Sequence, residues 1–161
     1  MWRADRTRIG LAMTGLAKLI AFDTDDLSVI SAHCQDAICK VSELEFDRKS
    51  QQFIVPLRRY AWEAQHKRKW WHWRTAKGQR RDAVLQFQHV RAAQTQNLPA
   101  TDTSALVLLS AVFHTDELPE GEIVLHFADN IHVKLQVDAL EAKLTDLGGV
   151  WQALAQPRHE G

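Results

Sequence analysis

The chain has 161 residues, 45% of them hydrophobic and 25% charged, and its formal net charge at pH 7 is zero. These values match one soluble domain that is long enough to bury a core, and the neutral total argues against a dedicated nucleic-acid coat protein. No apolar run approaches the roughly 18 residues that a transmembrane helix needs, so we expect no membrane insertion. Two cysteines, Cys34 and Cys39, are too few for a disulfide framework and favour a reducing, cytoplasmic location.

The first predicted elements are a strand and a helix. The run "LAKLIAF" predicts a strand over residues 16–22, and "DTDDLSVISAHCQDA" predicts a helix directly after it. Asp23 or Thr24 can cap that helix, and the two acids that follow suit the positive end of its dipole.

The spacing of apolar residues then changes to two, which is typical of strands. Residues 43–47 and 53–57 alternate on either side of the polar turn "DRKSQQ" and predict a hairpin. Pro56 restricts the second strand to an edge, a bulge or a strand end. The run "RRDAVLQFQHVRAAQTQ" predicts one strand over residues 80–96, and "ALVLLSAVF" at 105–113 is apolar on both faces, which predicts a central, covered strand.

The last predicted elements are a hairpin and a helix. "EIVLHF" and "IHVKLQV" flank "ADN", and the loop length decides the pairing of the two histidines in this hairpin. A two- or four-residue loop pairs His126 with Val133, whereas a three-residue loop places His126 opposite His132. The apolar spacing over residues 137–147 then predicts a short amphipathic helix that a pair of glycines ends.

The order of these elements predicts an α+β fold. We expect an antiparallel, curved or barrel-like sheet with an N-terminal helix and a short C-terminal helix that covers one side. This order is similar to that of a pleckstrin-homology-like barrel, a comparison that carries little functional weight. Residues 1–12 are expected to be a disordered tail or an extension from an upstream start, residues 13–151 a single domain, and residues 152–161 a C-terminal tail.

Four stretches carry a family resemblance. They are "LAKLIAFDTDDLSVISAHCQDAICKV", "YAWE", "RRDAVLQFQHV" and "VDALEAKLTDLGGVWQ", the last followed by "PRH". In order and spacing they resemble a bacterial family known as domain of unknown function 2948, over Leu16 to His159. The resemblance implies a bacterial cytoplasmic protein and assigns no catalytic or ligand residues. Members of that family begin close to Met13, which marks residues 1–12 as an extension.

The segment from His66 to Arg81 is the strongest candidate for a contact surface, because it holds seven Lys or Arg and three Trp but no acid. Basic side chains neutralise phosphates, and Trp rings stack on unpaired bases or anchor protein partners. If the rings instead pack on the protein's own sheet, the segment is a solvated connection between two strands. The candidate partner-binding residues are Lys67, Arg68, Lys69, Trp70, Trp71, Trp73, Arg74, Lys77, Arg80 and Arg81.

Other chemistry has weaker support in the sequence. Zinc sites need three or four converging ligands, and the chain contains no CxxC, HxH or HExxH pattern. The acids at residues 23–26 begin like a cation-binding loop, but capping of the following helix explains them better. There is no GxSxG motif and no glycine-rich phosphate loop. We therefore expect no catalytic residue, no metal ligand and no cofactor.

The charge distribution adds one further expectation. Nine acids lie between Asp102 and Asp146, and they can form a counter-surface for the basic segment, in the same molecule or in a neighbour. The preferred function is a non-catalytic cytoplasmic binding or scaffold domain that contacts a protein partner, or itself, through residues 66–81. The alternative is binding of RNA or single-stranded nucleic acid through the same segment, and a weaker alternative is an enzyme with a site inside the curved sheet.

Overall fold

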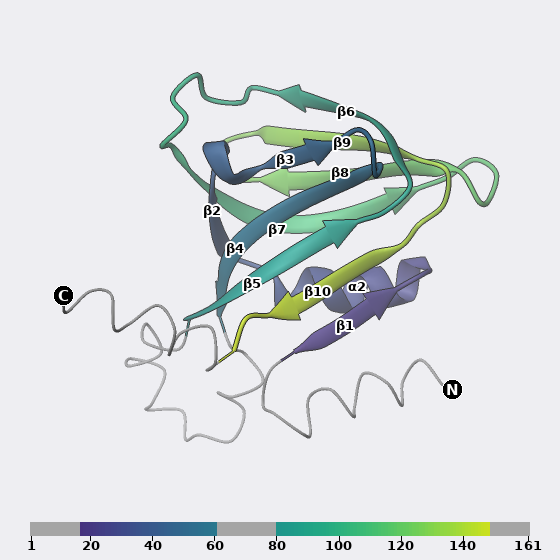
Figure 1. Ribbon diagram of the computed structural model, residues 1–161, viewed down its shortest axis with the longest axis horizontal. Helices are drawn as coiled ribbons and strands as arrows, with labels where there is room; N and C mark the ends of the chain where they lie inside the picture. The colour runs from purple at the N-terminus through teal and green to yellow at the C-terminus, as the bar shows by residue number, and fades with distance from the viewer. Residues whose placement is uncertain (1–16, 61–79, 149–161) are drawn as a thin grey trace.

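A sheet of ten strands dominates the computed structural model, which describes residues 17–60 and 80–148 (Figure 1). One α-helix and one short 3-10 helix complete the elements of this part of the chain. In chain order the elements are β1 (Lys18–Ala21), α2 (Thr24–His33), β2 (Ala37–Lys40), η1 (Val41–Glu43), β3 (Glu45–Asp47), β4 (Gln52–Tyr60), β5 (Arg80–Phe87), β6 (Val90–Gln96), β7 (Ala105–His114), β8 (Gly121–Phe127), β9 (Ile131–Val137) and β10 (Ala142–Asp146). The predicted tails at 1–12 and 152–161 lie outside the described residues.

The predicted antiparallel sheet is confirmed. Its strands follow the order β1-β10-β5-β4-β2-β7-β8-β9-β6, with β3 paired to β4, and every pair is antiparallel. The sheet does not close, because β1 and β6 form its two edges. It is therefore an open sheet and not a complete barrel.

The contacts of α2 require the sheet to curve. The helix packs against β7 and also against β1 and β10 (Figure 1). Five strand-to-strand steps separate β1 from β7, which amounts to about 24 Å along a flat sheet. A helix of 10 residues is only about 15 Å long. Both strands can reach it only when the sheet bends around it.

Local interactions fix where α2 begins and where it docks. Asp23 is the N-cap, and its side-chain Oδ1 accepts a hydrogen bond from the backbone N–H of Asp26 at 2.8 Å. Leu27 and Ile30 are buried below the helix. On β7, the backbone N–H of Ala111 donates to Oγ of Ser31 at 3.0 Å, just after a bulge that interrupts the pairing with β8. The helix thus provides an acceptor for one backbone N–H of β7 close to this bulge.

The core follows the period of two along the strands. In β9, every second side chain from Ile131 to Val137 is buried, and the same alternation runs through β5 and β10. Apolar side chains from both halves of the sheet and from α2 join in one buried cluster. The largest apolar side chains that are almost completely buried in it are Phe87, Phe127, Leu19, Leu27, Ile30 and Leu85.

The predicted C-terminal helix over residues 137–147 is wrong, because β10 occupies this segment. Leu140 is buried, and Ala142, Leu144 and Asp146 continue inward at a spacing of two. Leu140 and Leu144 fit both the helical and the strand spacing, and the backbone partners that β1 and β5 offer on either side favour a strand. The helix that would end a pleckstrin-homology-like barrel is consequently not found among the described residues.

The single strand predicted over residues 80–96 is divided into β5 and β6. His89 lies between them with a φ of 60°, in the left-handed region. The chain leaves the β4–β5–β10 part of the sheet at this point and continues as the edge strand beside β9. Whether the chain bends here depends on which strands β5 and β6 pair with. The alternation of apolar and polar residues carries no information about those partners.

Pro56 explains a break in the sheet between β2 and β4. These strands share only the pair of Ile38 with Arg58, so Lys40 would meet Pro56 two residues further along. A proline has no backbone N–H to donate, and the ladder ends there. The β4–β5 ladder passes Pro56 without interruption. The restriction predicted from Pro56 therefore applies only to the side of β4 that faces β2. On the side that faces β5, the strand pairs without interruption.

No helix in the described ranges is long and apolar enough to cross a membrane.

Candidate functional site

The sheet has two polar ends. The last residues of β4 and β10 and the first of β5 meet at the lower left of Figure 1, and the β7–β8 turn lies at the right. The first end carries the part of the predicted contact surface that the structure describes. The second end carries an acidic groove.

A buried ion pair organises the first end. Nε and Nη2 of Arg59 each donate to a different oxygen of the Asp146 carboxylate at 2.7 Å, and both side chains are fully buried. Oδ2 of Asp146 also accepts from the backbone N–H of Ala17 at 2.7 Å, and Arg59 donates to the carbonyl of Tyr60. This two-point geometry joins β4, β10 and the start of β1. Removing one partner leaves the other charge buried, which is strongly destabilising.

Arg80 and Arg81 are the first residues of β5, and they pair with Tyr60 and Arg59 at the end of β4. The guanidinium of Arg80 lies 3.9 Å from the ring centroid of Tyr60, and its Nη1 donates to the carbonyl of Arg58 at 3.1 Å. Nη1 of Arg81 lies 3.8 Å from Oδ2 of Asp146. Both arginines therefore make contacts within the fold. The other predicted contact residues lie outside the described residues, namely Lys67, Arg68, Lys69, Trp70, Trp71, Trp73, Arg74 and Lys77.

The ladder between β4 and β5 runs up to the pair of Tyr60 with Arg80. Residues 61–79 therefore connect two directly paired strand ends. Beside them, the side chain of Arg58 is 69% exposed and forms a long ion pair with Asp82 at 3.7 Å. This end thus presents exposed basic charge above a rigid, buried ion pair.

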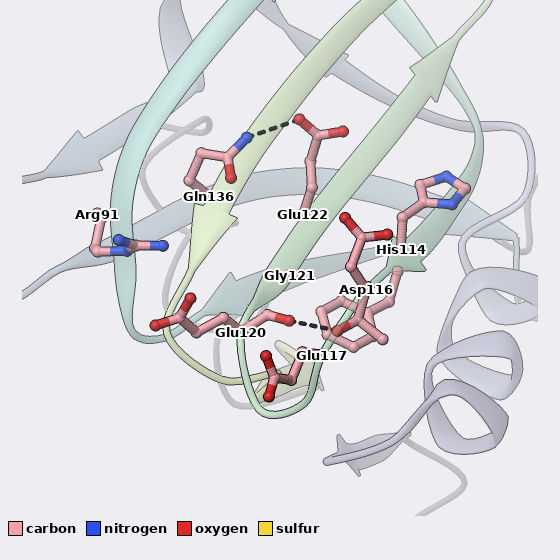
Figure 2. A pocket seen from close by; sticks show the side chains of 10 residues that line it. Arg91, His114, Asp116, Glu117, Glu120, Gly121, Glu122 and Gln136 are labelled. Carbon is pink, nitrogen blue, oxygen red and sulfur yellow. Dashed lines mark hydrogen bonds between the residues drawn. The ribbon is translucent and has the colours of Figure 1, made fainter.

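A groove of about 850 Å³ lies at the other end, around the β7–β8 turn (Figure 2). Four carboxylates line it, opposed by one arginine and one histidine. Glu122 accepts a hydrogen bond from Nε2 of Gln136 at 2.7 Å, whereas the acids of the turn itself are exposed. The charged lining residues are Asp116, Glu117, Glu120, Glu122, Arg91 and His114.

Gly121 shapes this groove. A Cβ at this position would overlap the ring of Phe113 and lie 2.6 Å from the carbonyl oxygen of His114, so no larger residue fits without a shift. Thr115 donates its hydroxyl to the carbonyl of Glu120 and closes the turn. The acids are consequently held around a defined hollow, which suits a basic partner.

Two histidines form a second polar feature, on the outer face of β8 and β9. The loop between these strands has three residues, because Phe127 pairs with Ile131, and His126 therefore pairs directly with His132. Their Nδ1 atoms lie 3.1 Å apart and the rings meet edge to face. Burial lowers the pKa of His126, and the charges of His132, His114 and Lys134 lower it further.

A smaller groove of about 360 Å³ opens where β2 and β4 diverge beside Pro56. Cys39 lines it, and burial raises the pKa of this thiol to about 12. Burial also raises the pKa of Cys34 to about 12, although the nearby Arg59 opposes the shift. Both thiols are protonated at neutral pH, which makes them poor nucleophiles and poor metal ligands. Within the described ranges, no three or more His, Cys, Asp or Glu side chains are grouped as metal ligands.

The acidic groove was not predicted from the sequence, and the sequence left open whether His126 pairs with His132 or with Val133. The turn "HTDELPEG" contains the acids of the groove, but the contributions of Arg91 and Gln136 come from β6 and β9 and depend on the strand order. For the histidines, the three residues of "ADN" are the signal, since this loop length sets His126 opposite His132.

The comparisons with known proteins give a family and no function. A family model described as "Protein of unknown function (DUF2948)" matches residues 17–159. No curated protein and no solved structure matches the chain.

Proposed function

The chain belongs to the DUF2948 family, and we propose that this member is a non-catalytic binding or scaffold domain that contacts a protein partner, or a second copy of itself, through residues 66–81. The same proposal places it in the bacterial cytoplasm, which agrees with two free, buried cysteines among the described residues.

The observation that carries the proposal is the pair of strand ends to which this part of the chain is attached. Tyr60 and Arg80, which flank residues 61–79, are directly paired and belong to the same end of the sheet as the buried pair of Arg59 and Asp146. Strand ends that are fixed in this way give a connecting segment a rigid base, as in binding proteins whose loops are carried by a stable sheet. Trp and Arg, the residue types that most often anchor protein contacts, are concentrated in the segment itself.

The acidic groove supports self-association as one form of this contact. It lies around the β7–β8 turn, at the end of the sheet away from Tyr60 and Arg80 (Figure 1). A basic segment at one end and four carboxylates at the other are complementary between neighbouring copies, which corresponds to a head-to-tail interface. Leu118, 71% exposed on the turn, adds apolar contact area beside the acids.

The test is sedimentation of the full-length protein over a range of concentrations and salt. For a protein contact, alanine at Trp70, Trp71 or Trp73 should weaken association about tenfold or more, because aromatic anchors contribute most of the energy of such interfaces. The triple alanine variant of residues 67–69 should weaken it less and chiefly reduce its dependence on salt. The proposal is contradicted if none of the three Trp variants changes the strength of association.

The groove is tested with a charge reversal and a matched control. Glu117→Lys should prevent head-to-tail association, whereas Glu45→Lys, an exposed acid on β3, should leave it unchanged. If the protein stays monomeric throughout, the same Trp variants are assayed by pull-down from the native cytosol. Capture of a defined protein that the Trp variants lose supports the partner form of the proposal.

Nucleic acid is the second candidate for the same segment, and the exposed Arg58 beside it supplies an additional phosphate contact. Its signature is different, because each neutralised phosphate releases counterions. Binding of single-stranded RNA should fall steeply with salt, and the triple variant of residues 67–69 should flatten that slope by about 3 × 0.7 in log–log units. A slope that the triple variant leaves unchanged rules out this candidate.

A further inference from the structure

We propose that His126 and His132 bind one divalent transition-metal ion between them, with Cu²⁺ bound more tightly than Ni²⁺ or Zn²⁺. Imidazole nitrogen suits all three ions, and the intrinsic order of affinity places copper above the other two. The inference is independent of the proposed protein contacts, because it concerns the outer face of β8 and β9.

The distance between the two imidazoles is that of two ligands on one ion. Nδ1 of His126 and Nδ1 of His132 lie 3.1 Å apart. With metal–nitrogen bonds of about 2.0–2.1 Å, two nitrogens at this separation subtend about 100° at the metal. That angle lies between the right angle of a square-planar site and the tetrahedral angle. The separation of the two nitrogens therefore fits one ion that lies beside the line between them.

The backbone holds the pair in place before any ion arrives. His126 and His132 are directly opposite in the β8–β9 ladder. The adjacent pair of Phe127 with Ile131 is buried on the other face of the sheet and fixes the register of the hairpin. Both histidines are only partly exposed, so the rings have lost much of their freedom already. A preorganised pair of ligands loses less entropy on binding than two free side chains.

Asn130 fixes which nitrogen of His132 is available. Nε2 of His132 lies 3.0 Å from Oδ1 of Asn130. An amide oxygen can only accept a hydrogen bond, so Nε2 carries the proton and the lone pair of Nδ1 points toward His126. In the metal-free pair, Nδ1–H of His126 donates to that lone pair. Binding of the ion at Nδ1 requires the other neutral tautomer of His126, so this proton leaves Nδ1 for water while Nε2 takes one up, and the ring stays neutral. The hydrogen bond to Asn130 keeps His132 oriented, as the outer partners of metal-bound histidines commonly do.

The surroundings set the remaining coordination. Within the described ranges no third His, Cys, Asp or Glu joins the pair, so water or a small anion would fill the other positions. Ser110 and Gln96 flank the histidines in the same row across the sheet and offer neutral oxygen atoms near these positions. Lys134, on the same face of β9, carries a positive charge that acts on His126 and opposes the ion.

Calorimetric titration of the untagged full-length protein with Cu²⁺ tests the site, and electron paramagnetic resonance reports the ligands. We expect one equivalent with nitrogen coupling in the spectrum. His126→Ala and His132→Ala should each weaken binding at least about tenfold, because two-point attachment is lost. Asn130→Ala should weaken it about tenfold, and Lys134→Gln should strengthen it.

The control is His89→Ala, since His89 is exposed and bonded to Glu141 away from the pair. This variant should bind Cu²⁺ as the wild type does. Persistence of the same affinity and nitrogen coupling in both His126→Ala and His132→Ala overturns the inference, as does the absence of any bound equivalent in the wild type. Should the alanine variants fail to fold, paramagnetic broadening of wild-type NMR signals decides the matter. It should centre on residues 126 and 132, and broadening centred elsewhere contradicts the site.

Discussion

Arg59 and Asp146 form the only fully buried ion pair among the described residues, and two hydrogen bonds of 2.7 Å join them. A buried pair contributes little net stability compared with apolar residues of the same size, but it is costly to break. Its value here is positional, because the carboxylate also accepts from the backbone of Ala17 and so fixes three strands at one point.

The first prediction concerns this pair. Arg59→Met should lower the free energy of unfolding by about 3–5 kcal/mol, because it leaves the Asp146 carboxylate buried without its partner. The neighbouring Arg58→Met is the matched control and should cost no more than about 1 kcal/mol, since the Arg58 side chain is 69% exposed. Urea denaturation of both variants measures the difference. Equal costs would contradict the structural role of the pair, and Arg59→Met with Asp146→Leu should recover most of the loss.

The second prediction concerns Asp47 in the β3–β4 turn. Its carboxylate accepts from the hydroxyl and backbone of Ser50 and from the backbone of Lys49, and the Ser50 hydroxyl does most to lower its pKa below the ordinary value of 3.8. A lowered pKa stabilises the folded state above pH 3.8, and this contribution is lost as the pH falls through the lower folded value.

NMR titration of the Asp47 carboxyl carbon should therefore show a pKa that Ser50→Ala moves upward. The loss of stability between pH 4 and pH 2 should shrink in Asp47→Asn, because the variant has no carboxyl group left to protonate. A pKa unaffected by Ser50→Ala would show that this hydrogen bond does not hold the charge. Thr145→Ala, far from this turn on β10, serves as the unperturbed control.

At the scale of elements, the cap of α2 is the most direct link from sequence to structure. Asp23 accepts from the backbone N–H of Asp26, and the acids of the first turn suit the helix dipole. Asp23→Ala should lower the free energy of unfolding by about 1 kcal/mol, whereas Asp23→Asn should cost far less, because asparagine caps equally well. Thermal unfolding by circular dichroism measures both, and equal losses in the two variants would contradict the capping role.

An element could be predicted where the spacing of its apolar residues fits a strand or a helix alone. Where the spacing fits both, the sequence did not decide between them. The alternation around the β8–β9 hairpin identifies two strands and their turn. Residues 137–147 fit a helix and a strand equally well, and the choice comes from the open backbone positions of β1 and β5, which lie far away in the sequence. The separation of β5 from β6 at His89 has the same origin. Long-range pairing outweighs local periodicity in each case.

At the scale of the whole molecule, the antiparallel architecture follows from the succession of strands, whereas the strand order does not. The sequence contains the residues of both polar ends, but their position at opposite ends of the sheet depends on that order (Figure 1). The acidic groove illustrates this, since Arg91 and Glu122 belong to strands that are separated by β9 in the sheet and by 25 or more residues along the chain. Spatial clusters of this kind are invisible to motif searches.

The pairing of β1 with β10 has a consequence for synthesis on the ribosome. Ala17 and Asp146 hydrogen-bond to each other across 129 positions of the chain. Among the described strands β1 emerges first, and it lacks its neighbour in the sheet until β10, the last of them, has been made. Contacts between such distant segments slow folding, and an unpaired strand in the meantime is a target for aggregation. The nascent chain should thus depend on chaperones to shield β1 and the apolar side of α2 until translation has passed residue 146.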